Sequence, residues 1–232
     1  MRPHVMLSAA MSLDGYLDDA TPDRLLLSNA ADFDRVDAAR AASDAIMVGA
    51  ETVRRDNPRL LVNDAARRAE REERGLPPFP LKVTVTAAGL LDPAAKFFTT
   101  GGEKVVYCAT PNCAGQRERL AGAPGTVVVD AGDPVDFPAI LEDLGRRGVR
   151  TLMVEGGTSL LTRFLRDDLA DEIQLAVAPF FVGDERAPRF VAPGEFPQNA
   201  KRRMTLVETR AIGDVAFLRY LVTRGTDDRT AP

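Results

Sequence analysis

A hydroxyl and a carboxylate follow a short apolar segment, and this spacing points to a ligand site. Residues 45–48 are apolar and end at Gly49, and Thr52 and Asp56 come three and seven residues later. In open α/β sheets, ligands bind beyond the carboxyl ends of the strands. A glycine at such an end lets a ligand approach the backbone closely. We therefore interpret residues 43–60 as one side of a binding crevice.

A second segment, VEGGTSLL at residues 154–161, repeats this arrangement with two glycines and two hydroxyl residues before a helical pattern. Amide groups at a helix start suit a phosphate group. The same letters are also typical of a tight strand-to-helix turn capped by Ser or Thr, so both interpretations stay open. The GxGxxG dinucleotide fingerprint does not occur. Small residues at 8–10 end a third apolar segment, where a flat ring could lie against the backbone.

Short apolar segments alternate with helical patterns along most of the chain, which predicts βαβ units and a mainly parallel sheet. The helix at 32–43 has Asn29 or Asp32 as its possible cap. The helix at 136–146 has apolar residues at i, i+3, i+4 and i+7. Strands are expected at 5–10, 44–49, 81–86, 104–108, 126–130 and 151–157, and a third helix at 159–165.

The C-terminal part has a different pattern. Residues 171–183 read as a strand closed by Pro and Gly, and residues 204–224 as two strands joined at 212–214, a hairpin signal. We therefore expect an α/β domain over residues 1–224, with a mixed sheet, a C-terminal antiparallel hairpin and helices on both faces. Residues 64–80 fit a charged surface excursion better than a domain joint. Residues 225–232 are expected to be a disordered tail.

Composition excludes several classes of function. The net charge is −4 and no basic run occurs, which argues against nucleic acid or an anionic membrane as the main partner. No apolar stretch is long enough to span a membrane and no signal peptide is evident, so we expect a cytoplasmic protein. Two cysteines and one histidine, His4 beside the N-terminus, do not provide a Ser-His-Asp site, a Cys-His site or a metal cluster. An enzyme of this composition needs a bound cofactor for difficult chemistry.

Four segments together resemble a known family in order and spacing. They are MSLDGYL, DAIMVGAETVRRDNPRL, VEGGTSLL and LADEIQLAVAPFFVG. They resemble the reductase domain of bacterial riboflavin biosynthesis, in the dihydrofolate-reductase-like superfamily, and the likeness runs over residues 5–222. The family's reaction is reduction by NADPH of the ribosyl group of 5-amino-6-(5-phosphoribosylamino)uracil to a ribityl chain.

The resemblance implies an NADPH site. The matched cofactor residues are Ala10, Met11, Leu26, Gly49, Thr52, Asp56, Ala87, Gly156, Gly157, Thr158, Ser159 and Leu160. The matched substrate residues are Arg24, Arg40, Leu60, Asn63 and Glu155. Asp56 and Glu155 are the two matched carboxylates that could act in catalysis, and the sequence does not say which does. Proline restricts the residue before it to extended backbone, so we expect a stiff segment around Asp56.

Three departures from the family pattern concern the substrate side. Ser8 stands where the family has lysine, Asn63 where it has arginine, and residues 23–28 where it has a serine-x-tryptophan. The lost basic positions favour an alternative, an NADPH-dependent reductase of a pterin, folate or specialised metabolite. A non-catalytic nucleotide-binding protein is a third interpretation. A homodimer is expected from the family likeness and from the apolar segment LAVAPFFV near a sheet edge.

Overall fold

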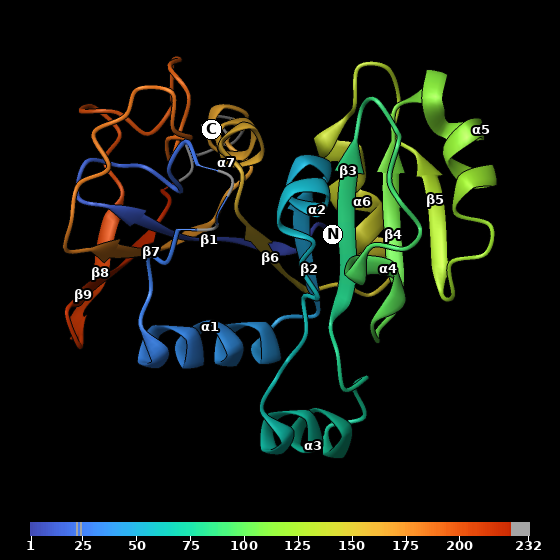
Figure 1. Cartoon of the computed structure of the whole chain (residues 1–232), viewed down its shortest axis with the longest axis horizontal. Coiled ribbons are helices and arrows are strands. Elements are labelled where there is room, and N and C mark those ends of the chain that lie inside the picture. The colour runs from blue at the N-terminus through green and yellow to red at the C-terminus, as the bar shows by residue number, and fades with distance from the viewer. Residues whose placement is uncertain (22, 24, 224–232) are drawn as a thin grey trace, which may run out of the picture.

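The structure, a computed structural model, describes residues 1–21, 23 and 25–223. Its nine strands form one sheet in the order β5-β4-β3-β2-β6-β1-β7-β9-β8 (Figure 1). The first seven strands in this order, β5, β4, β3, β2, β6, β1 and β7, each pair in parallel with their neighbours among these seven. Strand β9 pairs antiparallel with β7 and with β8. The predicted mixed α/β sheet with a C-terminal antiparallel hairpin is therefore confirmed. The predicted tail, residues 225–232, lies outside the described residues.

The strands are β1 (His4–Ser12), β2 (Ala45–Gly49), β3 (Leu81–Thr86), β4 (Lys104–Cys108), β5 (Thr126–Asp130), β6 (Thr151–Glu155), β7 (Glu172–Ala178), β8 (Thr205–Ile212) and β9 (Val215–Leu221). The helices are α1 (Ala30–Ala42), α2 (Ala50–Asp56), α3 (Ala65–Glu73), α4 (Lys96–Thr99), α5 (Thr110–Arg119), α6 (Phe137–Arg146) and α7 (Thr158–Arg166).

The central parallel strands are apolar on both faces because helices cover both sides. In β2, Ile46 and Val48 belong to a core cluster that also contains Val53 of α2 and Phe97 of α4. Met47, between them in sequence, belongs to the other cluster with α6 and α7. This alternation follows from the two-residue period of a strand. In Figure 1, β1 and β7 run across the direction of β3, β4 and β5, as the twist of a sheet requires.

The N-terminus of α1 is fixed by one side chain that also reaches the C-terminal hairpin. Asn29 caps the helix by accepting from the Asp32 amide at 3.0 Å. Its Nδ2 donates to the Ile212 carbonyl at 2.6 Å, at the turn between β8 and β9. Of the two possible caps, Asn29 is therefore the cap, and Asp32 lies in the first helical turn. This contact fixes the start of α1 relative to the sheet.

Two local features differ from expectation. The excursion at 64–80 contains helix α3, whose Arg71 is buried and donates to the carbonyls of Ala41 and Ser43. Asn57, before Pro58, is not extended; it is left-handed, with φ 44° and ψ 53°. Asn tolerates this region, and its Oδ1 accepts from the Lys96 amide at 2.6 Å. The expectation of extended backbone beside Asp56 was wrong, because this side chain stabilises a helix end there.

Candidate functional site

The three segments singled out from the sequence lie at the carboxyl ends of three neighbouring strands. Strands β2, β6 and β1 are neighbours and run parallel, so their carboxyl ends lie side by side. A cavity of about 370 Å³ lies elsewhere, whereas a larger one of about 610 Å³ opens between these ends, α1 and the segment before α1. Fourteen of the predicted site residues line the larger cavity: Ala10, Leu26, Arg40, Gly49, Thr52, Asp56, Leu60, Asn63, Glu155, Gly156, Gly157, Thr158, Ser159 and Leu160.

The turn after β6 brings the backbone close to α2. Gly156 and Gly157 have positive φ angles of 63° and 81°, which side-chain-bearing residues rarely adopt. A Cβ on Gly157 would lie 3.3 Å from the Thr52 hydroxyl. The carboxyl ends of the neighbouring strands β2 and β6 therefore lie close together and line one cavity, as the sequence predicted.

Helix α7 begins directly at this turn without a side-chain cap. Its N-cap is Gly157, and no side chain accepts from its first amides. Thr158 donates its hydroxyl to the Arg189 carbonyl instead. The tight strand-to-helix turn is therefore confirmed, and the expected Ser or Thr cap was wrong. Uncapped amides at a helix start, together with the partial positive charge of the helix dipole, favour an anion.

Arg40 and Glu155 form an ion pair across the cavity wall. Nε and Nη2 of Arg40 donate to the two carboxylate oxygens of Glu155 at 2.6 and 2.7 Å. The side chains are 18% and 17% exposed. Burial disfavours the charged guanidinium, but the Glu155 carboxylate outweighs this effect and raises the pKa of Arg40. The pair joins α1 to the end of β6 and keeps both charges at the cavity.

Asp37 organises the segment that carries Leu60 and Asn63. Its carboxylate accepts from the amides of Asn63 and Asp64 at 2.5 and 3.2 Å, and from Arg67 at 3.1 Å. Burial acts to raise the pKa of Asp37, but these donors together lower it. The Asn63 side chain also donates to Asp37, at 3.1 Å. Asn63 therefore lines the cavity with its amide nitrogen already bound to the protein.

Asp56 is the last residue of α2 and lines the cavity. The left-handed turn after it and the bond to Lys96 belong to Asn57. Asn57 therefore stabilises this turn, and Asp56 lines the same cavity as Thr52.

The remaining predicted residues are placed differently. Met11 packs against the core cluster formed with α6 and α7, and neither it nor Ala87 is among the residues that line the cavity. Arg24 lies outside the described residues. The sequence missed charged residues of the wall, which are Asp18, Asp32, Arg35, Asp37, Glu51 and Arg55. The one sequence feature that could have identified Asp32 and Arg35 is their position on the same predicted helix as Arg40.

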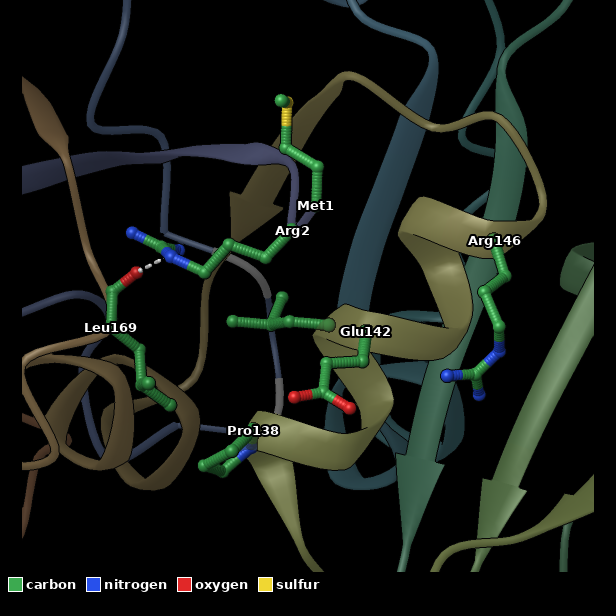
Figure 2. A pocket seen from close by; sticks show the side chains of 7 residues that line it. Met1, Arg2, Pro138, Glu142, Arg146 and Leu169 are labelled. Atoms are coloured by element: carbon green, nitrogen blue, oxygen red, sulfur yellow. Dashed lines mark hydrogen bonds between the residues drawn. The ribbon is translucent and has the colours of Figure 1, made fainter.

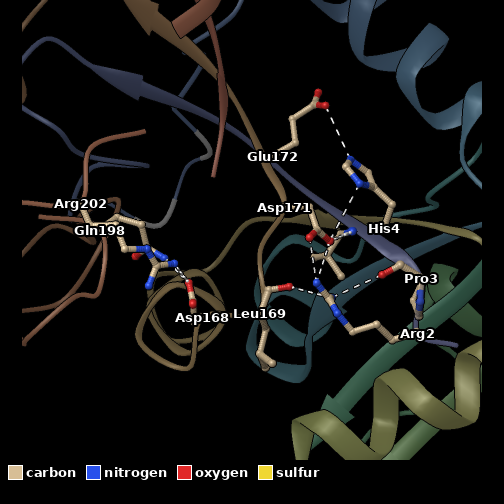
Figure 3. Close-up of polar contacts among 10 residues, drawn as sticks. Arg2, Pro3, His4, Asp168, Leu169, Asp171, Glu172, Gln198 and Arg202 are labelled. Carbon is tan, nitrogen blue, oxygen red and sulfur yellow. Dashed lines mark hydrogen bonds and ion pairs between the residues drawn. The ribbon is translucent and has the colours of Figure 1, made fainter. Parts of the chain in front are cut away.

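The opposite end of the strands holds the smaller cavity and the single histidine. That cavity lies between the chain start, α6 and Leu169, whose carbonyl accepts from Arg2 at 3.0 Å (Figure 2). His4 begins β1, is about half exposed, and its ring nitrogens lie 3.9 Å from Asp171 and 3.7 Å from Glu172 (Figure 3). His4 is therefore remote from the site at the carboxyl ends.

Over residues 1–21, 23 and 25–223, no cluster of three His, Cys, Asp or Glu could hold a metal ion, and no helix is long and apolar enough to cross a membrane.

Comparison with known proteins gives a consistent result. A model of the RibD C-terminal domain family matches residues 3–218. A 2,5-diamino-6-ribosylamino-4(3H)-pyrimidinone 5′-phosphate reductase of Archaeoglobus fulgidus is 37% identical over 197 residues, covering 84% of this chain and 88% of the relative. A reductase of the same name from Methanothermobacter thermautotrophicus is 32% identical over 228 residues, covering 96% of this chain and 99% of that one.

A solved structure shows the same fold. RibD of Acinetobacter baumannii superposes with a TM-score of 0.78 at 24% identity, over 96% of this chain and 59% of that one. The chain thus spans a little over half of that longer protein. Because the family model covers most of the sequence and the reductases from A. fulgidus and M. thermautotrophicus match along nearly their whole length, this chain belongs to the RibD C-terminal domain family, as its motifs predicted.

Proposed function

We propose that this chain is an NADPH-dependent reductase that converts the ribosyl group of a riboflavin-pathway phosphoribosylaminopyrimidine to a ribityl chain. The observation that carries the proposal is the meeting of β1, β2 and β6 in one cavity with Asp56 and the Arg40–Glu155 pair. Relatives named as pyrimidinone phosphate reductases, 37% and 32% identical to this chain, support the substrate class.

The cavity suits a nicotinamide dinucleotide on its β6 side. The positive φ angles of Gly156 and Gly157 and the uncapped start of α7 provide backbone room and amides for a diphosphate. Thr52 faces Gly157 across this space. The bound cofactor supplies the hydride. The residues we assign to it are Ala10, Met11, Leu26, Gly49, Thr52, Asp56, Ala87, Gly156, Gly157, Thr158, Ser159 and Leu160, of which Met11 and Ala87 rest on the family likeness alone.

The chain's own side chains orient the substrate and hold charge near the reacting carbon. We assign Arg40, Leu60, Asn63 and Glu155 to the substrate, and Arg24 by family likeness. The ion pair with Arg40 keeps Glu155 in one orientation, which preorganises the carboxylate for a substrate polar group. The Asp56 carboxylate would stabilise positive charge on the substrate nitrogen during reduction. Either carboxylate could relay a proton, and kinetic tests must separate the two.

A second candidate, reduction of a pterin, folate or specialised metabolite, draws support from the charges of the wall. Ser8 and Asn63 replace two basic residues of the family pattern. The cavity-lining arginines of the described chain are all ion-paired: Arg35 with Asp32, Arg40 with Glu155, and Arg55 with Asp18. A substrate phosphate would have to compete with these carboxylates. This candidate keeps the cofactor and changes only the substrate.

Cofactor binding and turnover test the proposal together. NADPH should raise the melting temperature, because a ligand that binds only the folded state stabilises it by mass action. NADH should raise it less. Oxidation of NADPH is then followed with the phosphoribosylaminopyrimidines, dihydrofolate and a dihydropterin. Turnover of the phosphoribosylaminopyrimidines supports the main proposal, and turnover of a pterin or folate alone supports the second. No melting shift and no turnover would refute both.

We also propose that the chain forms a homodimer in the cytoplasm. The segment LAVAPFFV does not form a sheet edge, because β7, which contains its first residues, lies between β1 and β9. Strand β8 is an edge of the sheet and is largely exposed, with Leu206 and Val207 at 47% and 44% exposure. Exposed edges with apolar side chains normally need cover. Light scattering at micromolar concentration should give the mass of a dimer, and Leu206→Lys should shift it toward a monomer. A monomeric wild type would refute the proposal.

A further inference from the structure

One carboxylate of the cavity wall has an oxygen that nothing in the protein satisfies. Asp32 is fully buried and lines the cavity, yet its Oδ2 has no hydrogen-bond partner among the described residues. The other buried side-chain atoms without a partner in that part of the chain belong to Thr84, Gln116 and Gln198, and none of these lines the cavity. A buried polar atom without a partner is costly, so its persistence at a cavity indicates a ligand donor.

The other oxygen of Asp32 is held firmly. Oδ1 accepts from Nε of Arg35 at 2.6 Å, and Arg35 donates from Nη1 to Gln174 at 3.0 Å. Gln174 donates in turn to Glu172 at 2.8 Å. The Arg35 guanidinium also lies 4.5 Å from the centre of the Phe217 ring. This network joins α1 to β7 and β9, and it fixes the Asp32 side chain with one oxygen bound and one free.

The position of Asp32 relative to Arg40 suits an elongated substrate. The two residues lie eight positions apart on α1, which is about 12 Å along the helix axis. Arg40 and Glu155 are at one end of this wall and Asp32 is at the other. A ribosylaminopyrimidine that places its sugar beside Arg40 and Glu155 would direct its ring toward Asp32.

A carboxylate oxygen at this position would discriminate between two forms of the pyrimidine ring. A carboxylate only accepts hydrogen bonds. A 2-amino-4(3H)-pyrimidinone presents an amino group and the adjacent ring N–H on one edge, both of them donors. A uracil has a carbonyl oxygen at position 2, and this oxygen would face the carboxylate without a hydrogen between them. A site built to accept from a donor strongly rejects an analogue that lacks it.

We propose that Asp32 is a specificity-determining residue that accepts from the 2-amino edge of the ring and makes this chain prefer the 2,5-diaminopyrimidinone over the 5-aminouracil substrate. This inference rests on the proposed reductase function and names the ring form that the site takes. The inference is based on Oδ2 of Asp32, which is buried and has no hydrogen-bond partner, in a residue that lines the cavity.

The test compares kcat/KM for 2,5-diamino-6-ribosylamino-4(3H)-pyrimidinone 5′-phosphate and 5-amino-6-(5-phosphoribosylamino)uracil at saturating NADPH. The wild type should prefer the diamino substrate by at least about tenfold. In Asp32→Asn, one amide oxygen can still accept from Arg35 while the amide nitrogen donates into the cavity. The preference should therefore fall at least about tenfold and approach or pass equality, because an amide donor suits the uracil carbonyl.

Asp34→Asn is the matched control, because Asp34 is on the same helix, is 66% exposed and does not line the cavity. It should keep the wild-type ratio. Equal use of both substrates by the wild type, or equal losses on both in Asp32→Asn, would overturn the inference and leave the reductase function standing. Failure of the wild type to reduce either one would overturn the function and the inference with it. Should Asp32→Asn not fold, a wild type that lacks the preference for the diamino substrate would still overturn the inference.

Discussion

The two ends of the parallel strands have opposite characters. At the amino ends, charged groups are paired inside the protein. Lys82, at the start of β3, donates to the Thr100 hydroxyl and carbonyl at 2.8 and 3.1 Å, and Arg2 makes two bonds to Asp171 at 2.8 and 2.9 Å. At the carboxyl ends lie the glycine turn after β6, the uncapped helix α7 and the unpartnered oxygen of Asp32. Polar groups whose hydrogen bonds are all made within the protein stabilise the fold, whereas polar groups without such a partner are available to a ligand.

This contrast predicts where substitutions alter kinetics and where they alter stability. Replacements at the carboxyl ends should affect binding or turnover. Replacements of similar severity at the amino ends should lower the free energy of unfolding and leave the folded enzyme active. Each of the following tests compares the two ends, beginning with the largest expected effect.

Asp56→Asn should slow reduction by about a hundredfold to a thousandfold, about 2.7–4 kcal/mol, which is typical of losing one preorganised electrostatic group. Asparagine keeps the shape of the side chain and removes its charge, so NADPH affinity should fall less than about tenfold, or 1.4 kcal/mol. Single-turnover kinetics and an NADPH titration separate the two quantities. Near-normal reduction together with a lowered melting temperature would show that Asp56 only supports the end of α2.

Gly157→Val should weaken NADPH binding by about 1–3 kcal/mol, roughly fivefold to 150-fold, because the new Cβ meets Thr52 and the φ of 81° is strained. Gly148→Val is the matched control. Gly148 precedes the amino end of β6, has a φ of 86° and has open space around it. Both variants should lose stability, but only Gly157→Val should lose affinity in a calorimetric titration. Normal NADPH affinity in its folded fraction would make the turn after β6 a structural feature alone.

Asp44→Ala should lower the free energy of unfolding by about 1–3 kcal/mol and leave kcat and KM of the folded enzyme unchanged. The Oδ2 of Asp44 accepts from the amides of Arg150 and Thr151, both at 2.9 Å, at the amino ends of β2 and β6. The variant removes these hydrogen bonds, one at an exposed amide and one at a partly buried amide. Urea unfolding and steady-state kinetics measure the two effects. A lower kcat in fully folded Asp44→Ala would show that the amino ends of the strands also affect catalysis.

Lys82→Met should change how stability depends on pH. Burial, with a smaller effect of Lys104, lowers the pKa of Lys82 to about 7. The unfolded lysine keeps its proton up to about pH 10.5, so between pH 7 and 10 the unfolded state binds more protons and stability from this group rises with pH. Urea unfolding between pH 6.5 and 9.5 should show a shallower rise in the variant than in the wild type. Parallel curves would mean that Lys82 stays charged when folded.

Much of the sheet could be predicted from the sequence because its parallel strands are continuous apolar segments. Residues 104–108 and 126–130 were predicted with the bounds that β4 and β5 have. Helix α6 was predicted to within one residue because its apolar face repeats at i, i+3, i+4 and i+7. Helices α2, α3, α4 and α5 were missed. Helices α2 and α3 are short and strongly charged, and tertiary bonds such as those of Asn57 and Arg71 stabilise their ends.

The glycine turn, the Thr52 hydroxyl and the Asp56 carboxylate could be predicted from the sequence, because strand ends and glycines have local signatures, whereas Glu155 was predicted from the family likeness. The rest of the cavity wall could not be predicted. Whether the Asp32 carboxylate is a cap, a surface charge or a ligand group depends on Asn29 taking the cap and on Arg35 taking only one oxygen. Those partners involve β7 and the β8–β9 turn, some 140 to 180 residues away in the chain. Local sequence therefore determined the sheet and the side of the cavity that we assign to the cofactor, and only tertiary packing decided which charges remain available to a ligand.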